Sequence, residues 1–314
     1  MHVGGLNPGT RADPEGGLTV KVRFAVAPSA HHATPEGLAG FVDDLEDLRF
    51  DTVWLSDLPL RAAIDPVVGL AHAAARTSRI KLGANVVPLG REPVTLAKAL
   101  AQVDRLSGGR LLLNFVVGLG EPAERAVLGV AGADRGRLLA EITPLFRTWW
   151  AGGTVDHRTD RYHLPAVASP GRPLQEPLEI WFGGRSPDAL VRAGQFADGW
   201  LGASVTPAEA GGAVDAIQRA AADAGRAIDP EHFGISFAYA AEPIDPSAVL
   251  QAHHRRPDVD VADLLPVGPA RLRSLVRRYA DAGISKFVVR PVGRDATDRR
   301  HLHELAGVVH DLQT

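Results

Sequence analysis

Cysteine is absent from this sequence of 314 residues, and other features that mark whole classes of protein are missing with it. Without cysteine there are no disulfides, no thiolate nucleophile and no Cys-ligated zinc, which fits a reducing compartment such as the cytoplasm. The net charge is only −3, so no excess of one sign points to nucleic acid or to an anionic membrane. No apolar run approaches the roughly 20 residues that span a bilayer. These absences favour a cytoplasmic protein that contacts neither nucleic acid nor a membrane.

The first 19 residues differ in composition from the rest of the chain. They contain no apolar segment of the kind found in signal peptides, and they are rich in Gly and Pro. We therefore expect residues 1–19 to form a flexible tail. Residues 20–314 alternate between strand and helix patterns without a linker, and 45% of the chain is hydrophobic. This pattern predicts a single domain with a sizeable core.

A strand-and-helix unit repeats along the chain. Apolar strand patterns begin near residues 22, 52, 80 and 110, and each is followed by a helical pattern. Four more strand patterns begin near residues 178, 199, 232 and 286. Between the two sets lie a long helical region that ends in "LLAEITPLFRTWWAGG" and an inserted hairpin or loop, "TVDHRTDRYHL". Eight such units predict an α/β fold, a closed (β/α)8 TIM barrel with insertions, and residues 246–267 read as another insertion. A doubly wound open sheet is the structural alternative.

Polar residues stand where several predicted strands end, and in a barrel of this kind the active site lies at that end. Asp57 follows the second strand and Glu121 follows the fourth, so both are candidates for general acid or base. His31, after the first strand, is a weaker candidate. Asp57 and Glu121 are also explained as helix caps or surface carboxylates, and His32, beside His31, makes the choice of histidine ambiguous. No grouping of residues resembles a metal site.

The turn "GGRSP" leads from the fifth strand pattern straight into a helix. Glycine lets backbone N–H groups approach an anion, and a helix N-terminus favours negative charge. Gly183, Gly184, Arg185 and Ser186 are therefore candidates for a phosphate seat. An ordinary turn with Ser186 as the helix cap explains the same residues equally well.

The third strand, in "RIKLGANVVPLG", carries Gly83, Ala84 and Asn85 at its centre. Gly and Asn are poor strand residues, and a glycine inside a strand often marks a bulge or the close approach of another group. The sequence pattern alone does not say which of these applies here.

The chain resembles the bacterial luciferase-like family, in particular its oxidoreductases that depend on the deazaflavin coenzyme F420. The segments that carry the resemblance are "FDTVWLSD", "RTSRIKLGANVV", "LAKALAQVDRLSGGRLLL", "IWFGGRSPDALVRAGQFADGWL" and "VRRYADAGISKFVVRP". Their order and spacing cover roughly residues 20 to 312. The resemblance implies the barrel fold and a flavin-type cofactor at its mouth, and since family members often form dimers, a homodimer is a candidate assembly.

The resemblance also assigns roles to single positions. In the family, the third strand bears a bulge with a non-prolyl cis peptide that backs the flavin ring, and here that bond would be Asn85–Val86. Asp57 matches an Asp that approaches the deazaflavin, and Glu121 matches a proposed proton donor. Leu58 stands where the sugar-phosphate dehydrogenases of the family have a catalytic His, which argues against that activity. The expected cofactor contacts are Asp57, Asn85, Val86, Val117, Gly118, Gly183, Gly184, Arg185 and Ser186.

The leading hypothesis is an F420-dependent oxidoreductase that moves a hydride between C5 of the deazaflavin and a small organic substrate. Arg61 and Arg91, just beyond the second and third strands, would then suit the anionic tail of F420. An FMN-dependent monooxygenase that uses reduced flavin and oxygen is the alternative, which the segment "LLLNFVVG" favours. A non-catalytic flavin-binding barrel is the third hypothesis.

Overall fold

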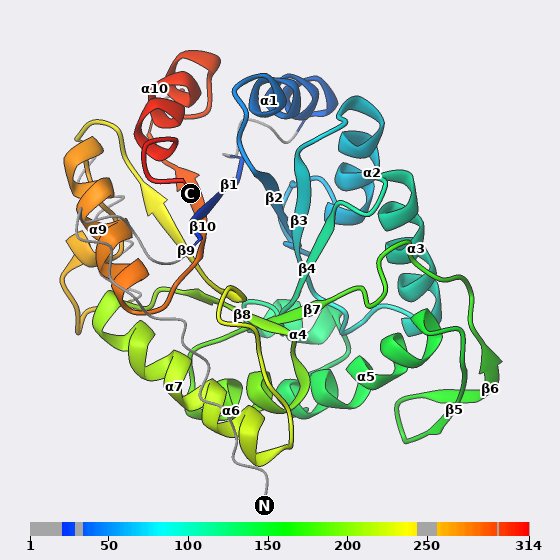
Figure 1. Cartoon of the computed structure of the whole chain (residues 1–314). Coiled ribbons are helices and arrows are strands. Elements are labelled where there is room, and N and C mark those ends of the chain that lie inside the picture. Colours follow the sequence, from blue (N-terminus) through cyan, green and yellow to red (C-terminus); the bar gives the residue numbers. More distant parts are fainter. Residues whose placement is uncertain (1–20, 29–33, 244–255, 294, 314) are drawn as a thin grey trace, which may run out of the picture.

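Eight parallel strands close into a barrel in the computed structural model, which describes residues 21–28, 34–243, 256–293 and 295–313. The order around the barrel is β1-β2-β3-β4-β7-β8-β9-β10. Strand β10 pairs with β1, which closes the ring and excludes the open sheet. Helices surround the strands (Figure 1). The predicted (β/α)8 barrel is therefore confirmed, whereas the tail predicted at 1–19 lies outside the described residues.

The elements have the following bounds. The barrel strands are β1 (Arg23–Val26), β2 (Thr52–Ser56), β3 (Lys81–Val86), β4 (Leu111–Phe115), β7 (Ile180–Gly183), β8 (Gly199–Ala203), β9 (Phe233–Tyr239) and β10 (Lys286–Pro291). The helices are α1 (Pro35–Asp47), α2 (Pro66–Arg76), α3 (Pro93–Leu106), α4 (Pro122–Val127), α5 (Arg135–Trp150), α6 (Pro187–Phe196), α7 (Pro207–Asp223), α9 (Pro269–Asp281) and α10 (Arg299–Val309), with a 3₁₀ turn η2 (Val261–Asp263). A separate hairpin pairs β5 (Thr154–Arg158) with β6 (His163–Ala168).

A polar cap followed by proline fixes where several helices begin. The Thr34 side chain accepts from the N–H of Gly37 at 3.1 Å, and Pro35 starts α1. Asp65 does the same for α2, which starts at Pro66. Proline suits this position because the first helical N–H has no partner within the helix. None of the described helices is both long and apolar enough to cross a membrane.

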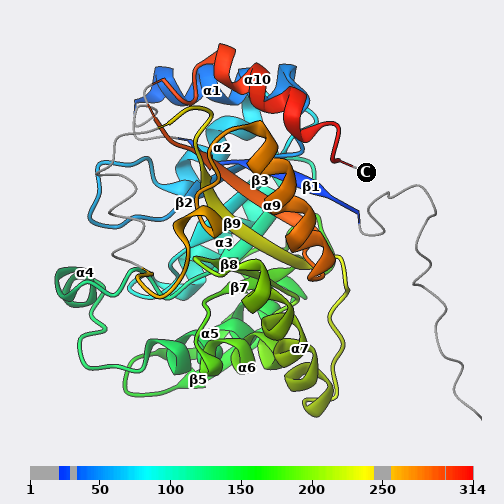
Figure 2. The same cartoon turned by 90° about the vertical axis from the view of Figure 1, so that its left-hand side faces the viewer.

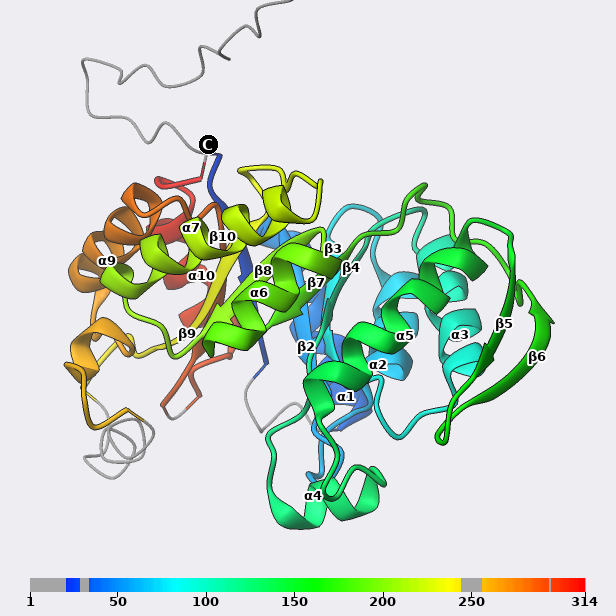
Figure 3. The ribbon, with the colours of Figure 1, turned by 90° about the horizontal axis from the view of Figure 1, so that it is seen from below.

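The long helical region expected before the hairpin is two helices, α4 and α5. The chain between them contains Gly129 and Gly132, both with positive φ, which ends α4 after two turns. Figures 2 and 3 show α4 projecting beyond the ends of the barrel strands. The hairpin expected from "TVDHRTDRYHL" is confirmed as β5 and β6, which pair antiparallel outside the barrel.

The strands separate two apolar layers because successive side chains point to opposite faces. In β2, Val53 and Leu55 belong to the large cluster between strands and helices. Trp54 points the other way and belongs to a small cluster inside the barrel with Trp181 and Leu201. The barrel is thus filled from within by two indole rings, and the polar side chains gather closer to the mouth.

Candidate functional site

Three uncharged polar side chains form a row across β2, β3 and β4, near the carboxyl ends of these strands. Ser56, Asn85 and Asn114 are direct neighbours in the strand register. The amide of Asn114 donates to Asn85 Oδ1 at 2.8 Å, and the amide of Asn85 donates to Ser56 Oγ at 3.0 Å. Asn114 is buried, and its own Oδ1 has no partner among the described residues. Since buried polar atoms are normally paired, this oxygen is suited to accept a hydrogen bond from a bound molecule or from water.

The small residues of β3 have a packing explanation. A Cβ atom on Gly83 would lie 2.1 Å from Cε3 of Trp54, so the indole ring occupies the space that a side chain would need. Ala84 faces the outer core, and Asn85 belongs to the polar row. The close approach that the sequence suggested is therefore that of Trp54.

The expected cis peptide between Asn85 and Val86 is wrong in this structure. Among the described residues the cis peptide bond is that between Glu176 and Pro177. Strand β3 stays in register with β4 as far as Val86, and the Val86 carbonyl accepts from the N–H of Val116 at 2.9 Å. Regular pairing to the end of the strand leaves no bulge that would call for a cis bond.

This packing yields a test at Gly83. Gly83→Ala should lower the free energy of unfolding by about 1–3 kcal/mol because the new methyl group overpacks against Trp54. Urea denaturation measures the change. Gly40→Ala is the matched control, since nothing lies within 4 Å of a Cβ there and alanine should gain up to about 1 kcal/mol in a helix. Equal urea midpoints for Gly83→Ala and the wild type would contradict the packing explanation.

Asp57 lies at the mouth, directly after β2, and is 8% exposed. Its Oδ2 accepts from the N–H of Val87 at 3.1 Å and from Nη2 of Arg91 at 2.8 Å. The same Nη2 donates to Asp65 at 2.6 Å, so one guanidinium links two carboxylates. Burial raises the pKa of Asp57, while Arg91 and the Val87 N–H oppose the shift. A buried carboxyl with a raised pKa can hold or give up a proton closer to neutral pH than a free one can.

Glu121 is more exposed and is held by a different arginine. Nη2 of Arg61 lies 2.9 Å from Glu121 Oε1, and the two side chains are 60% and 48% exposed. The pair ties the loop after β2 to the loop after β4. Glu121 precedes α4, but its side chain makes no capping hydrogen bond and pairs with Arg61 at the mouth instead.

The loop after β4 is shaped by residues that the sequence did not single out. Glu124 is buried and accepts from the N–H of Gly120 at 3.2 Å. Arg135 donates to the carbonyls of Val117 and Gly118 at 2.8 and 3.3 Å. Val117 and Gly118 therefore have fixed backbones at the mouth. Arg135 is far from Val117 and Gly118 in sequence, so no local pattern predicted its hydrogen bonds to their carbonyls.

The turn between β7 and α6 is open to solvent. Gly184, Arg185 and Ser186 are exposed, and Gly184 has a φ of 114° that favours glycine. Ser186 caps α6 by accepting from the N–H of Ala189 at 3.3 Å. The indole N–H of Trp200 donates to the Gly184 carbonyl at 2.8 Å and holds the turn in place. The helix cap expected at Ser186 is thus confirmed, while the phosphate seat at the same exposed turn stays a prediction.

Small side chains are also required beneath this turn. A Cβ atom on Gly183 would lie 2.9 Å from Cγ1 of Val116, which crowds the end of β4. The exposed turn over a glycine fits a phosphate group, which backbone N–H groups and a helix dipole stabilise. The residues present therefore suit a phosphate-bearing cofactor.

A model of the luciferase-like monooxygenase family matches residues 15–287. The chain belongs to this family. An F420-dependent glucose-6-phosphate dehydrogenase of Kineococcus radiotolerans is 27% identical over 85% of this chain and 90% of its own length. A putative coenzyme F420-dependent oxidoreductase of Mycobacterium tuberculosis is 31% identical over 56% of this chain, which spans 54% of that relative.

A solved structure supports the fold of this luciferase-like chain. An F420-dependent secondary alcohol dehydrogenase, in complex with an F420–acetone adduct, superimposes with a TM-score of 0.77 at 16% identity. The match covers 94% of this chain and all of that one. At this identity the likeness shows the shared barrel fold.

The luciferase-like barrel brings most of the predicted site residues to one mouth. Asp57, Glu121 and the turn from Gly183 to Ser186 all follow the carboxyl ends of parallel strands. His31 lies outside the described residues. In the described part of the chain, no three His, Cys, Asp or Glu side chains are grouped to hold a metal ion.

Arg61 and Arg91 are not free rim cations as the sequence suggested. Arg61 is paired with Glu121, and Arg91 is paired with Asp57 and Asp65. Arg185 remains the exposed arginine of the phosphate-seat turn. The anionic tail of F420 would thus meet fewer unpaired arginines at the mouth than the sequence alone implied.

The exposed Arg61–Glu121 pair permits a clean test of Glu121. Glu121→Gln should change the free energy of unfolding by less than about 1 kcal/mol, because exposed ion pairs contribute little. If Glu121 transfers a proton, steady-state turnover should nevertheless fall at least about tenfold. Arg61→Gln is the control, since it breaks the same pair but keeps the carboxylate. Equal losses of turnover in both variants would assign the effect to the ion pair.

Proposed function

We propose that this luciferase-like protein is an oxidoreductase that binds coenzyme F420 at the barrel mouth and acts on a small organic substrate. The observation that carries the proposal is one mouth that holds both a buried carboxyl with a raised pKa, Asp57, and an exposed helix N-terminus, at Ser186. The first suits proton transfer and the second suits a phosphate. Relatives that are named as F420-dependent support the choice of cofactor.

When bound, F420 would supply hydride transfer at C5 of its deazaflavin ring. Gly184 and Ser186 would hold the phosphate through backbone N–H groups. Asn85 and Val117 would line the ring, with Asn114 oriented beneath them by its hydrogen bond to Asn85, whereas the side chain of Val86, an expected contact, is fully buried in the outer core. Asp57 would hold a proton at its carboxyl, and Arg91 would keep that carboxyl in place.

The substrate is not assigned by the relatives' names. One relative is named as a glucose-6-phosphate dehydrogenase, but Leu58 occupies the position after Asp57 where the resemblance expects a catalytic His. Leu58 cannot exchange a proton, so we expect little activity with glucose 6-phosphate. A panel of sugar phosphates and secondary alcohols, followed by F420 absorbance, tests this, and it also separates an enzyme from a non-catalytic flavin-binding barrel.

A titration decides between F420 and FMN. Both carry a phosphate, so the seat at Ser186 does not distinguish them, whereas the long anionic tail of F420 does. We expect F420 to bind with a dissociation constant of about 1 μM or less, FMN to bind more weakly, and high salt to weaken F420 binding by screening its tail. Fluorescence titrations of both cofactors at low and high ionic strength give these values. Clear preference for FMN, with oxygen consumption after reduction, would favour the monooxygenase instead.

A further inference from the structure

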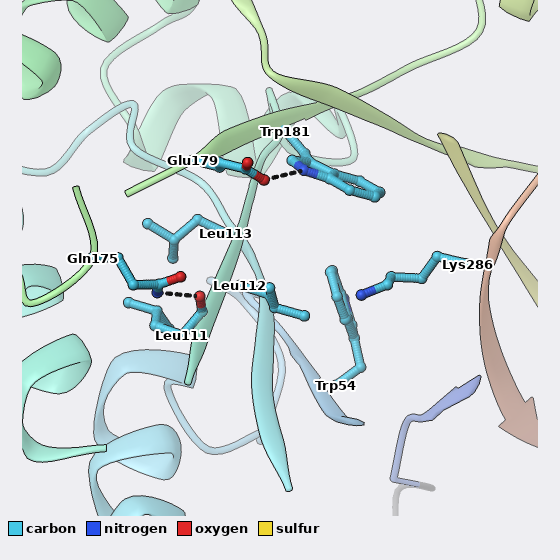
Figure 4. A pocket seen from close by; sticks show the side chains of 8 residues that line it. All are labelled: Trp54, Leu111, Leu112, Leu113, Gln175, Glu179, Trp181 and Lys286. Atoms are coloured by element: carbon cyan, nitrogen blue, oxygen red, sulfur yellow. Dashed lines mark hydrogen bonds between the residues drawn. The ribbon is translucent and has the colours of Figure 1, made fainter. Parts of the chain in front are cut away.

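A small cavity lies at the opposite end of the barrel from the candidate site. Its lining comes largely from strand starts and the segments just before them, and Figure 4 shows the side chains of Trp54, Leu111, Leu112, Leu113, Gln175, Glu179, Trp181 and Lys286 around it. About 20 Å³ is open to the centre of a water molecule, which is room for one or two waters. The cavity therefore admits only very small molecules.

Lys286 extends its amino group into this cavity from the first residue of β10. The residue is 9% exposed, and Nζ lies 5.8 Å from the centre of the Trp181 ring. In Figure 4 the amino group lies between the Trp54 and Trp181 rings. Ion pairs within 4.0 Å are found for the described Lys21 and Lys81, but none is found for Lys286. The cation–π contact with Trp181 favours the ammonium, but burial without a close carboxylate is costly and lowers the pKa of the amine.

The charged groups around Lys286 come from several elements and act from a distance. Asp51, before β2, and Glu179, before β7, favour the ammonium, whereas Arg23 on β1 and Lys81 on β3 disfavour it. His232, before β9, packs against Trp181, and the centres of the two rings are 5.5 Å apart. Burial is the largest influence and lowers the pKa of Lys286 to about 8. About a tenth of the amine is thus unprotonated at pH 7, far more than in an exposed lysine.

A hydrogen-bond donor in the same lining is also unpartnered. Trp54 is 2% exposed, and its Nε1 has no partner among the described residues. The other indole, Trp181, already directs its Nε1 to Glu179 at 3.4 Å. The residues that line the cavity therefore include a buried amine, Lys286, and an indole, Trp54, whose N–H lacks an acceptor.

We propose that Lys286 is a carbamylation site, at which carbon dioxide adds to the side-chain amine. The nitrogen lone pair forms a bond to carbon, one C=O π pair moves onto oxygen, and the nitrogen releases a proton to water. The product is a carbamate, R–NH–CO₂⁻, with one proton released for each molecule of carbon dioxide bound. No oxidant, reductant or metal is needed.

The volume of the cavity and the charged residues near Lys286 favour carbon dioxide as the electrophile. Carbon dioxide is linear and triatomic, so it enters a space in which larger carbonyl compounds do not fit. The carbamate oxygens would accept the free N–H of Trp54. Arg23 and Lys81 would offset the new negative charge, against which Asp51 and Glu179 act.

Cyanate tests the reactivity of the amine, because it is also linear and triatomic and carbamoylates amines irreversibly. The chain has only four lysines, and Lys98 is exposed on α3 as an internal standard. In the intact protein near pH 7.5 we expect Lys286 to be labelled at least about tenfold faster than Lys98, because more of it is unprotonated. Peptide mass spectrometry over time gives both rates. Labelling of Lys286 no faster than Lys98 would show a purely structural lysine and overturn the proposal.

Carbon dioxide itself is tested by equilibrating the protein with ¹³C-bicarbonate, alkylating with a trialkyloxonium salt to trap carbamates, and mapping the peptides. We expect a trapped carbamate at Lys286. Trp54→Phe keeps an aromatic ring but removes the N–H, so cyanate labelling should persist while carbamate occupancy falls several-fold. A carbamate trapped at the terminal α-amine but not at Lys286 would overturn the proposal. Equal carbamate occupancy in Trp54→Phe and the wild type would show that the Trp54 N–H does not stabilise the carbamate.

Discussion

Asp57→Asn is expected to lower turnover by about 10²–10⁴-fold while cofactor affinity changes much less. Asparagine keeps the shape of the side chain, and its oxygen can still accept the Val87 N–H. The ability to hold and release a proton is what is lost. Steady-state kinetics and a fluorescence titration, carried out with the same preparation, separate turnover from binding.

Asp65→Asn is the matched control for Asp57→Asn. It removes the other carboxylate that Arg91 contacts, and asparagine still caps α2. We expect near wild-type turnover in this control, because Asp65 acts through Arg91 and not on the substrate. Wild-type turnover in Asp57→Asn with a genuine substrate would make Asp57 a structural residue.

The pH profile provides a second readout at Asp57. Burial raises its pKa, so the protonated form persists to higher pH than in a free aspartate. If this form is the proton donor, the rate should fall as the pH rises through the raised pKa, and Asp57→Asn should lack this limb. The stability contribution has the same direction: the folded state binds the proton more tightly, so this contribution is lost as the pH rises through the folded-state pKa.

Ser186→Asp is expected to weaken F420 binding by about 10–100-fold, since it places a carboxylate beside the proposed phosphate seat. Aspartate caps a helix as well as serine does, so α6 should form normally. Ser186→Asn is the matched control, because it is an uncharged cap of similar size to aspartate and should bind F420 within a few-fold of wild type. Thermal melting of both variants checks the fold.

Equal F420 affinities for the Ser186→Asp and Ser186→Asn variants would show that the phosphate does not bind at this turn. That outcome would leave the family and the barrel unchanged. It would, however, remove the helix N-terminus at Ser186 from the argument for cofactor binding.

Much of the fold could be predicted because its signals are local. The apolar strand runs, Pro66 at the start of α2, Gly108 at the end of α3 and Ser186 before α6 each act within a few residues of chain. The positions of Asp57 and Glu121 at the mouth followed from the strand order alone. Local patterns of this kind identify elements and the ends at which chemistry gathers.

The contacts that build the site join residues far apart in sequence, and no local pattern revealed them. Trp54 fills the space beside Gly83, a contact that the sequence left undecided, whereas the family resemblance implied a bulge with a cis bond in this strand. Arg256 lies in the stretch 246–267 that the sequence pattern indicates as an insertion, yet it is buried and donates to Glu209 and to the Ser204 carbonyl. Asn114 read as part of an apolar strand, although it extends the polar row across the barrel.

The guanidinium of Arg91, shared by two acids, makes the mouth tolerant of change. When one of Asp57 and Asp65 is replaced, the other still anchors the arginine and with it the loop that enters α3. The residue at position 57 can therefore drift during evolution, or be exchanged by design, without collapse of the rim around it. Such redundancy gives the barrel room to acquire a new reaction before it loses its architecture.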